Sequence, residues 1–157
     1  MNAIELLKED HQLAISLIDE LETADDQAGS DPAQTENFNK LHQALIVHTR
    51  MEEEVFYPAL ENFDETQDLI KEAYQEHDQV DQLLTLLSSQ APNEEEFQEA
   101  LAELRSNLED HIEEEENELF PQAEQLLGQQ RLQEMVRQMQ AIKGDAHQVE
   151  ATMHRRA

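Results

Sequence analysis

Apolar residues recur along most of this 157-residue chain in alternating steps of three and four, the stripe of a helix packed against other helices. The chain contains only 3 Gly and 4 Pro. Leu, Glu, Gln and Ala, which lose little rotamer freedom in a helix, are abundant. The stripes, and the breakers between them, predict an all-α protein with helices over residues 3–23, 34–60, 65–88, 94–126 and 129–154.

Polar side chains interrupt the stripes of the first four predicted helices at matching places. Each stripe carries one histidine, and in the second and fourth helices a glutamate follows one turn later, still on the stripe. A core glutamate without compensation costs several kcal/mol, because an unpaired charge is poorly tolerated in a low-dielectric interior. These side chains therefore call for a shared partner; they are His11, His48, Glu52, His77, His111 and Glu115.

The interruptions belong to an internal repeat. An acidic residue followed by histidine occurs at His11 and again 66 residues later at His77. The pattern H-x-x-x-E-E-x-x-x-[YF]-P begins at His48 and again 63 residues later at His111. Two similar helical hairpins placed face to face make a four-helix bundle, with the four histidines converging at its centre.

The repeated residue types point to a metal site. Histidine and glutamate four residues apart lie on one helix face, so each such pair presents a nitrogen and a carboxylate to the same place. Without cysteine, any metal must be held by histidine, carboxylate or backbone. Four imidazoles and two carboxylates over-supply a single Zn²⁺, which usually takes four ligands. Two ions bridged by the glutamates fit better; we favour iron, with manganese and zinc as alternatives.

The ordered motif over residues 1–126 resembles the hemerythrin-like HHE cation-binding domain family. The resemblance implies an up-down four-helix bundle around a non-haem, oxo- or hydroxo-bridged di-iron site. It also implies binding or sensing of dioxygen, peroxide or nitric oxide, or a role in iron homeostasis or oxidative stress, and leaves low-turnover peroxide or nitric oxide chemistry open. Carried over to this chain, the terminal ligands are His11, His48, His77 and His111, and the bridging ligands are Glu52 and Glu115.

This chain departs from the oxygen-carrying hemerythrins on its third helix. Those proteins have an H-x-x-x-H pair there, whereas Asp81 stands four residues after His77. The departure argues against reversible oxygen transport and leaves one ion more open, or ligated by Asp81 or water. The ferritin-like class, the competing di-iron bundle, uses Glu-x-x-His pairs, which none of the four stripe histidines forms.

Several other residues have two readings. His42, six residues before His48, is either a core residue or an additional donor to the site. Tyr57 is expected to cap the core, although a phenol near two iron ions could take part in redox chemistry. Two groups of residues are expected on the solvated surface. The histidines outside the repeat, His147 and His154, form one group. The other is the remaining acids of the E-E segments, one of which could instead support the metal from behind a ligand; these acids are Glu53, Glu54, Glu113, Glu114 and Glu116.

Charge narrows the choice of partners. The chain has 37 Asp+Glu against 10 Lys+Arg, a net charge of −27, which repels phosphate backbones and anionic lipids. We expect no nucleic-acid partner and no membrane partner, and the absence of a signal peptide or apolar span predicts a cytoplasmic protein. A different class of function, an acidic interaction or metal-storage module with a structural metal, is the alternative to di-iron chemistry.

The C-terminal extension, residues 127–157, has its own apolar stripe and five of the ten basic residues. Its simplest interpretation is a fifth helix packed on the acidic bundle. A sharper hypothesis is an arm that joins two copies of the chain in a homo-oligomer. Sedimentation of a chain ending at Gly128 tests this, and an unchanged oligomeric state would refute it.

Overall fold

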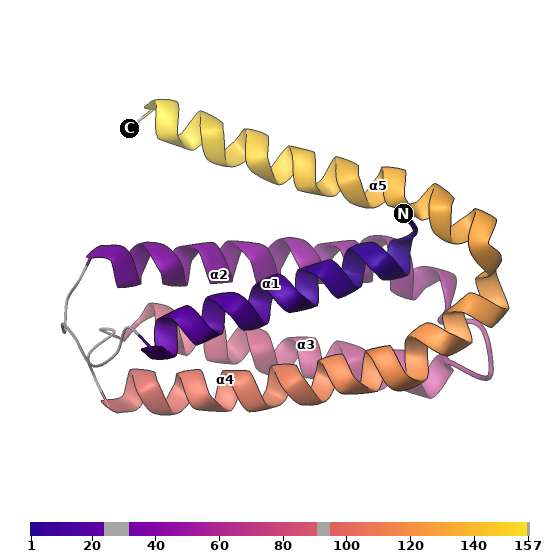
Figure 1. Ribbon diagram of the computed structural model, residues 1–157, viewed down its shortest axis with the longest axis horizontal. Coiled ribbons are helices and arrows are strands. Elements are labelled where there is room, and N and C mark those ends of the chain that lie inside the picture. Colours follow the sequence, from indigo (N-terminus) through magenta and orange to yellow (C-terminus); the bar gives the residue numbers. More distant parts are fainter. Residues whose placement is uncertain (24–31, 91–94, 157) are drawn as a thin grey trace.

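The computed structural model describes the backbone of residues 1–23, 32–90 and 95–156, and the side chains of residues 1–23, 35–90 and 95–146. All regular elements in these ranges are helical, which confirms the predicted fold class. Helices α1 to α4 run lengthwise as a bundle, and the chain then turns back along the outside as α5 (Figure 1). The long helices are α1 (Ala3–Thr23), α2 (Pro32–Met51), α3 (Gln67–Ser88), α4 (Glu95–Glu114) and α5 (Phe120–Arg156).

A single π-helical turn interrupts the helix in each copy of the H-x-x-x-E-E pattern. These turns are η2 (Glu52–Phe56) and η4 (Glu115–Leu119). The residue after each turn, Tyr57 or Phe120, donates its backbone N–H to the carbonyl five residues earlier. Such turns concentrate at functional sites, because the extra residue re-aims the side chains around it.

The first π turn changes which apolar residues face the core. The stripe predicts Val55 on the buried face, but the structure leaves Val55 half-buried and buries Phe56 completely. Pro58 lies in the 3₁₀ turn η3 (Tyr57–Ala59), where the helix of the first hairpin ends. Pro121 lies two residues after η4, and helix α5 continues through it.

The predicted break between the last two helices is a kink within α5. Gly128 has φ 79° and ψ 163°, a conformation that is essentially restricted to glycine. Beyond the kink, α5 lies against the bundle and buries apolar residues in a core cluster shared with α1, as expected for a fifth packed helix. The buried residues of this segment are Leu132, Met135, Met139 and Ile142.

Two apolar clusters fill the bundle, one toward each end. One contains Leu7, Phe56 and Phe120, and the other contains Ile18 and Leu104. The stripe histidines stand between residues of the two clusters along each helix, so the polar layer lies between them. No helix in the described part of the chain is long and apolar enough to cross a membrane.

Candidate metal centre

Each of the four bundle helices contributes one histidine to the polar layer. The exposed fraction of every one is 6% or less, so none is a surface residue. In each case Nε2 points toward the buried glutamates and Nδ1 toward an acid farther out. The histidines are His11 on α1, His48 on α2, His77 on α3 and His111 on α4.

Glu52 lies at the centre of the layer and is fully buried. Its Oε1 is 2.9 Å from His77 Nε2, 3.3 Å from His48 Nε2 and 3.8 Å from His111 Nε2. One carboxylate thus faces histidines from three helices. Such a position suits a carboxylate that bridges two cations.

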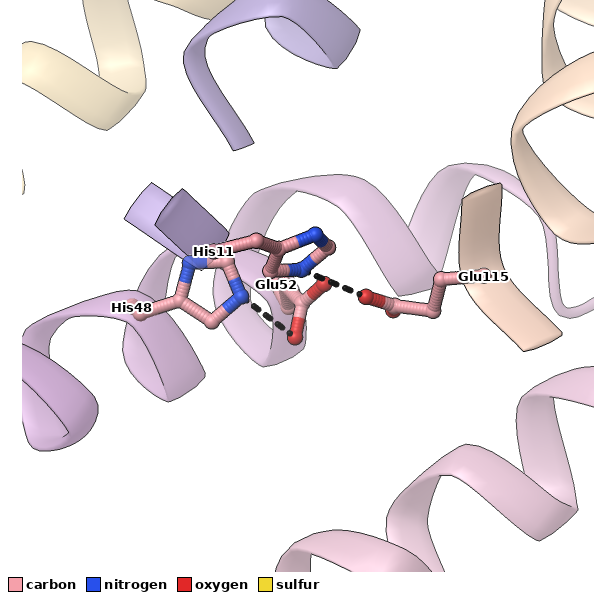
Figure 2. Close-up of side chains that lie close together, drawn as sticks. All are labelled: His11, His48, Glu52 and Glu115. Carbon is pink, nitrogen blue, oxygen red and sulfur yellow. Dashed lines mark hydrogen bonds and ion pairs between the residues drawn. The ribbon is translucent and has the colours of Figure 1, made fainter. Parts of the chain in front are cut away.

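Glu115, with 2% exposure, approaches the same layer from the second π turn. Its Oε1 is 3.1 Å from His11 Nε2 and 3.4 Å from His111 Nε2. Figure 2 shows Glu115 facing His11 while Glu52 faces His48. The structure therefore brings together all six side chains that the stripes singled out.

The histidine Nδ1 atoms contact carboxylates outside the layer, which we call the outer carboxylates. Two of them belong to the acids that precede histidine in the two copies of the repeat. His48 Nδ1 donates to Asp10 Oδ2 at 3.1 Å, and His111 Nδ1 donates to Glu76 Oε1 at 2.6 Å. A carboxylate on Nδ1 fixes the ring and the tautomer and makes Nε2 a better metal ligand. The acid before each histidine thus supports the histidine of the other motif in its own hairpin.

Two more outer carboxylates come from the second glutamate of each E-E pair. His77 Nδ1 donates to Glu53 at 2.6 Å, and His11 Nδ1 donates to Glu116 at 2.8 Å. For Glu53 and Glu116 the structure favours the alternative expectation, a supporting acid, over a residue of the solvated surface alone. Each is about one-third exposed and reaches inward across the hairpins. Their signal was the repeat, since both copies carry the second glutamate at the same place.

The atoms of the layer fit a pair of cations. His48 Nε2, Glu52 Oε2 and His111 Nε2 are buried without a hydrogen-bond partner in the described residues, a costly arrangement unless something binds them. The ligand atoms form two groups, each within 4.8 Å, and Glu52 belongs to both. The first group is His11, His48, Glu52 and Glu115; the second is Glu52, His77 and His111.

The metal-free layer holds protons tightly. Burial by itself lowers the pKa of His48, but Glu52 and the hydrogen bond to Asp10 raise it to about 10. Burial likewise lowers the pKa of His77, while hydrogen bonds to Glu52 and Glu53 raise it to about 9. Burial raises the pKa of Glu52, yet the surrounding histidines hold it well below its usual range. A cation binding at Nε2 must therefore displace protons.

Tyr57 joins the layer through its hydroxyl. The phenol is fully buried, donates to Glu115 Oε2 at 2.5 Å and lies 3.3 Å from His77 Nε2. Its ring stacks on His77, just as the ring of Phe120 stacks on His11. Repeat-matched aromatic residues thus cover one histidine in each half, but only one half has a hydroxyl.

Other candidates stay away from the layer. His42 packs on the ring of Phe38 and belongs to neither ligand group. Asp81 is exposed one turn after His77 and also belongs to neither group. The side chains of His147 and His154 lie outside the described residues.

A helical bundle with a buried histidine and carboxylate layer defines a class of metal-binding proteins. The chain matches the hemerythrin HHE cation binding domain over residues 2–123, and it belongs to that family. Its structure is similar to that of a hemerythrin HHE cation binding domain-containing protein, a Rv2633c homolog, from Mycobacterium kansasii. The two share 26% identity and a TM-score of 0.81, over 98% of this chain and 93% of that one.

A second relative is a longer protein. The chain is 28% identical over 149 residues to a DNA nickase of Nostoc sp. strain PCC 7120. The alignment covers 94% of this chain and 41% of the nickase. The chain therefore spans less than half the length of that relative.

Proposed function

We propose that this protein holds two iron ions in its histidine and glutamate layer and that they meet a small molecule: dioxygen, peroxide or nitric oxide. The observation that carries the proposal is the orientation of the histidines. Every Nε2 points into the layer and every Nδ1 is held by an outer carboxylate. This is how metal-ligating histidines are normally supported.

The two ligand groups support one division of the residues. His11 and His48 would hold one ion and His77 and His111 the other, with Glu52 shared between them and Glu115, which faces His11 and His111, as the second carboxylate. Nitrogen and carboxylate ligands without sulfur suit iron, and also manganese or zinc. When bound, a pair of iron ions supplies one-electron redox chemistry and open coordination positions.

The surroundings favour a small ligand. All six ligand residues are at most 6% exposed, so a bulky substrate could not reach them from solvent. Phe120 covers His11 and Tyr57 covers His77, so both faces are shielded from bulk water. The Tyr57 hydroxyl holds a proton at Glu115 Oε2, close to any molecule that reaches the ions.

We do not extend DNA nicking to this chain. The named nickase is more than twice as long, and its activity belongs to that whole protein. Here 37 acids face 10 basic residues, which disfavours contact with a phosphate backbone. The alternative that we retain is a storage or interaction module whose metal is structural.

The test is anaerobic reconstitution with Fe²⁺, followed by metal analysis and absorption spectroscopy. We expect about two iron ions per chain and near-ultraviolet charge-transfer bands after oxidation. Adding O₂, H₂O₂ or NO to the reduced protein should change the spectrum. Protein that takes up no iron contradicts the proposal, and loaded protein that is inert to all three molecules favours the structural-metal alternative.

A variant pair makes the assignment specific. His111→Ala should lower iron content and thermal stability together, since metal binding is linked to folding. His42→Ala, which removes a histidine of the same bundle outside both ligand groups, should load iron like the unmodified chain. Equal loading of the two variants would remove His111 from the site.

A further inference from the structure

The outer carboxylates Asp10 and Glu76 occupy matching places in the repeat but have opposite surroundings. Asp10 Oδ1 accepts a hydrogen bond of 2.8 Å from Lys143 Nζ, while Asp10 Oδ2 holds His48. Lys143 lies on α5 beyond the kink, outside the part of the chain that matches the family. The cation is 31% exposed and the carboxylate 12%, so water screens the pair only partly.

Glu76 has acids as neighbours instead. Its carboxylate lies within 4.8 Å of those of Glu72 and Glu114, and no lysine or arginine pairs with it in the described ranges. In the first hairpin the matching positions are Leu6 and Met51, which are buried in the cluster that α5 completes. The fifth helix thus covers one half of the bundle and leaves the matching face of the other half acidic.

This difference acts on two ligand groups that each hold two histidines and share Glu52, while Glu115 Oε1 faces one histidine of each group, His11 and His111. A lysine on Asp10 neutralises the charge behind His48, whereas Glu76, the carboxylate behind His111, pairs with no lysine or arginine in the described residues. A unit charge roughly 10 Å from a divalent ion, at an effective dielectric constant near 40 for a partly exposed pair, changes a binding constant about tenfold. The cation at His77 and His111 is therefore favoured over the one at His11 and His48.

Resting on the proposed function, we infer that Lys143 is a positioning residue that makes the two metal positions inequivalent. The His77 and His111 position binds first and more tightly, and the His11 and His48 position binds second. Lys143 sets the difference in affinity between the two positions through Asp10, without touching either ion.

The experiment is anaerobic calorimetric titration of the full chain with Fe²⁺. The unmodified protein should bind in two resolved steps. Lys143→Met should tighten the weaker step about tenfold and so reduce the difference in affinity between the two steps. Lys143→Arg keeps the charge and should preserve the difference in affinity. Arg137→Met removes the same charge from an exposed position on the same helix and should preserve the difference as well.

A matched pair of variants assigns the steps to the positions. Asp10→Asn should weaken the second step and Glu76→Gln the first, each about tenfold, the usual effect of losing an outer carboxylate. Mössbauer spectra give an independent signature. One equivalent of ⁵⁷Fe²⁺ followed by unlabelled Fe²⁺ should give one quadrupole doublet, and the reverse order should give the other.

Separate outcomes overturn the two proposals. Two ions bound with indistinguishable affinity, or a Lys143→Met variant whose weaker step becomes weaker still, would overturn the role of Lys143 and leave the metal site standing. Label spread over both doublets in either order would do the same. A chain that binds no Fe²⁺ at all would overturn the metal site itself.

Discussion

The two hairpins of the bundle share their inner layer and differ in what lies outside it. Both carry a histidine, a glutamate one turn later and a π turn at that glutamate. At matching outer positions the first hairpin has Leu6 and Met51, and the second has Glu72 and Glu114. The repeated residues thus define what the layer can bind. The unrepeated residues decide which half α5 covers and how the halves differ.

The largest expected effect on metal binding comes from removing Glu52, the central carboxylate of the shared layer. Glu52 belongs to both ligand groups, whereas Glu115 belongs to one. Glu52→Ala should therefore abolish binding of both ions, and Glu115→Ala should retain part of the tighter one. Metal analysis after anaerobic loading measures both. Equal losses in the two variants would mean that the glutamates are interchangeable and that the halves are closer to symmetric.

pH should affect the metal-free protein strongly. In the folded protein the pKa of His48 is about 10 and that of His77 about 9, both above the ordinary histidine pKa of 6.5 that an unfolded chain approaches. Their stabilisation is complete below pH 6.5, because both states are then protonated. It is lost as pH rises toward 10, because the unfolded chain releases its protons first.

Denaturant unfolding at several pH values, with and without iron, checks this. The unfolding free energy of the metal-free protein should fall between pH 6.5 and about 10. The iron-loaded protein should lack this fall, since the metal replaces the Nε2 protons. Parallel pH profiles for the two forms would show that the histidines do not exchange protons for metal.

Tyr57 and Phe120 allow a reciprocal exchange between the halves. Tyr57→Phe removes the donor to Glu115 and leaves a buried carboxylate oxygen without it, at a cost of about 1–3 kcal/mol of unfolding free energy. Thermal and denaturant unfolding of the metal-free protein measure the loss. Phe120→Tyr is the matched control, since it adds a hydroxyl beside His11 in the half that lacks one. An unchanged stability of Tyr57→Phe would contradict the hydrogen bond.

The residues of the buried polar layer and the helices were predictable from the sequence because buried charge is costly. A histidine or glutamate on an apolar stripe is conspicuous, and the repeat doubled the signal at Glu52 and Glu115. The repeat marks the position of the outer carboxylates Glu53 and Glu116 but not their role, because partly exposed acids look alike in a chain with 37 of them. Only the direction in which a histidine Nδ1 points in the folded protein distinguishes a supporting acid from a solvated one.

Two features depended on tertiary structure. The π turns add one residue without changing composition, so the stripe placed Val55 where Phe56 packs. Helix α5 docks on the first hairpin, where Leu6 and Met51 offer an apolar surface. The matching positions of the second hairpin are Glu72 and Glu114, which are acidic. This difference between the hairpins predicts the docking side only once the fifth helix is known to return along α1.

The smallest effects concern the kink that carries α5 back to the first hairpin. Gly128→Ala places a Cβ in open space but forces alanine to φ 79°, which should cost about 1–3 kcal/mol. Gly144→Ala, in the regular part of the same helix and equally free of contacts, should stabilise the protein by about 0.5–1 kcal/mol. Denaturant unfolding compares them. Since the kink positions Lys143, Gly128→Ala should also narrow the gap between the two Fe²⁺ binding steps, and Gly144→Ala should not. A narrowed gap in both variants would separate the inequivalence from the placement of Lys143.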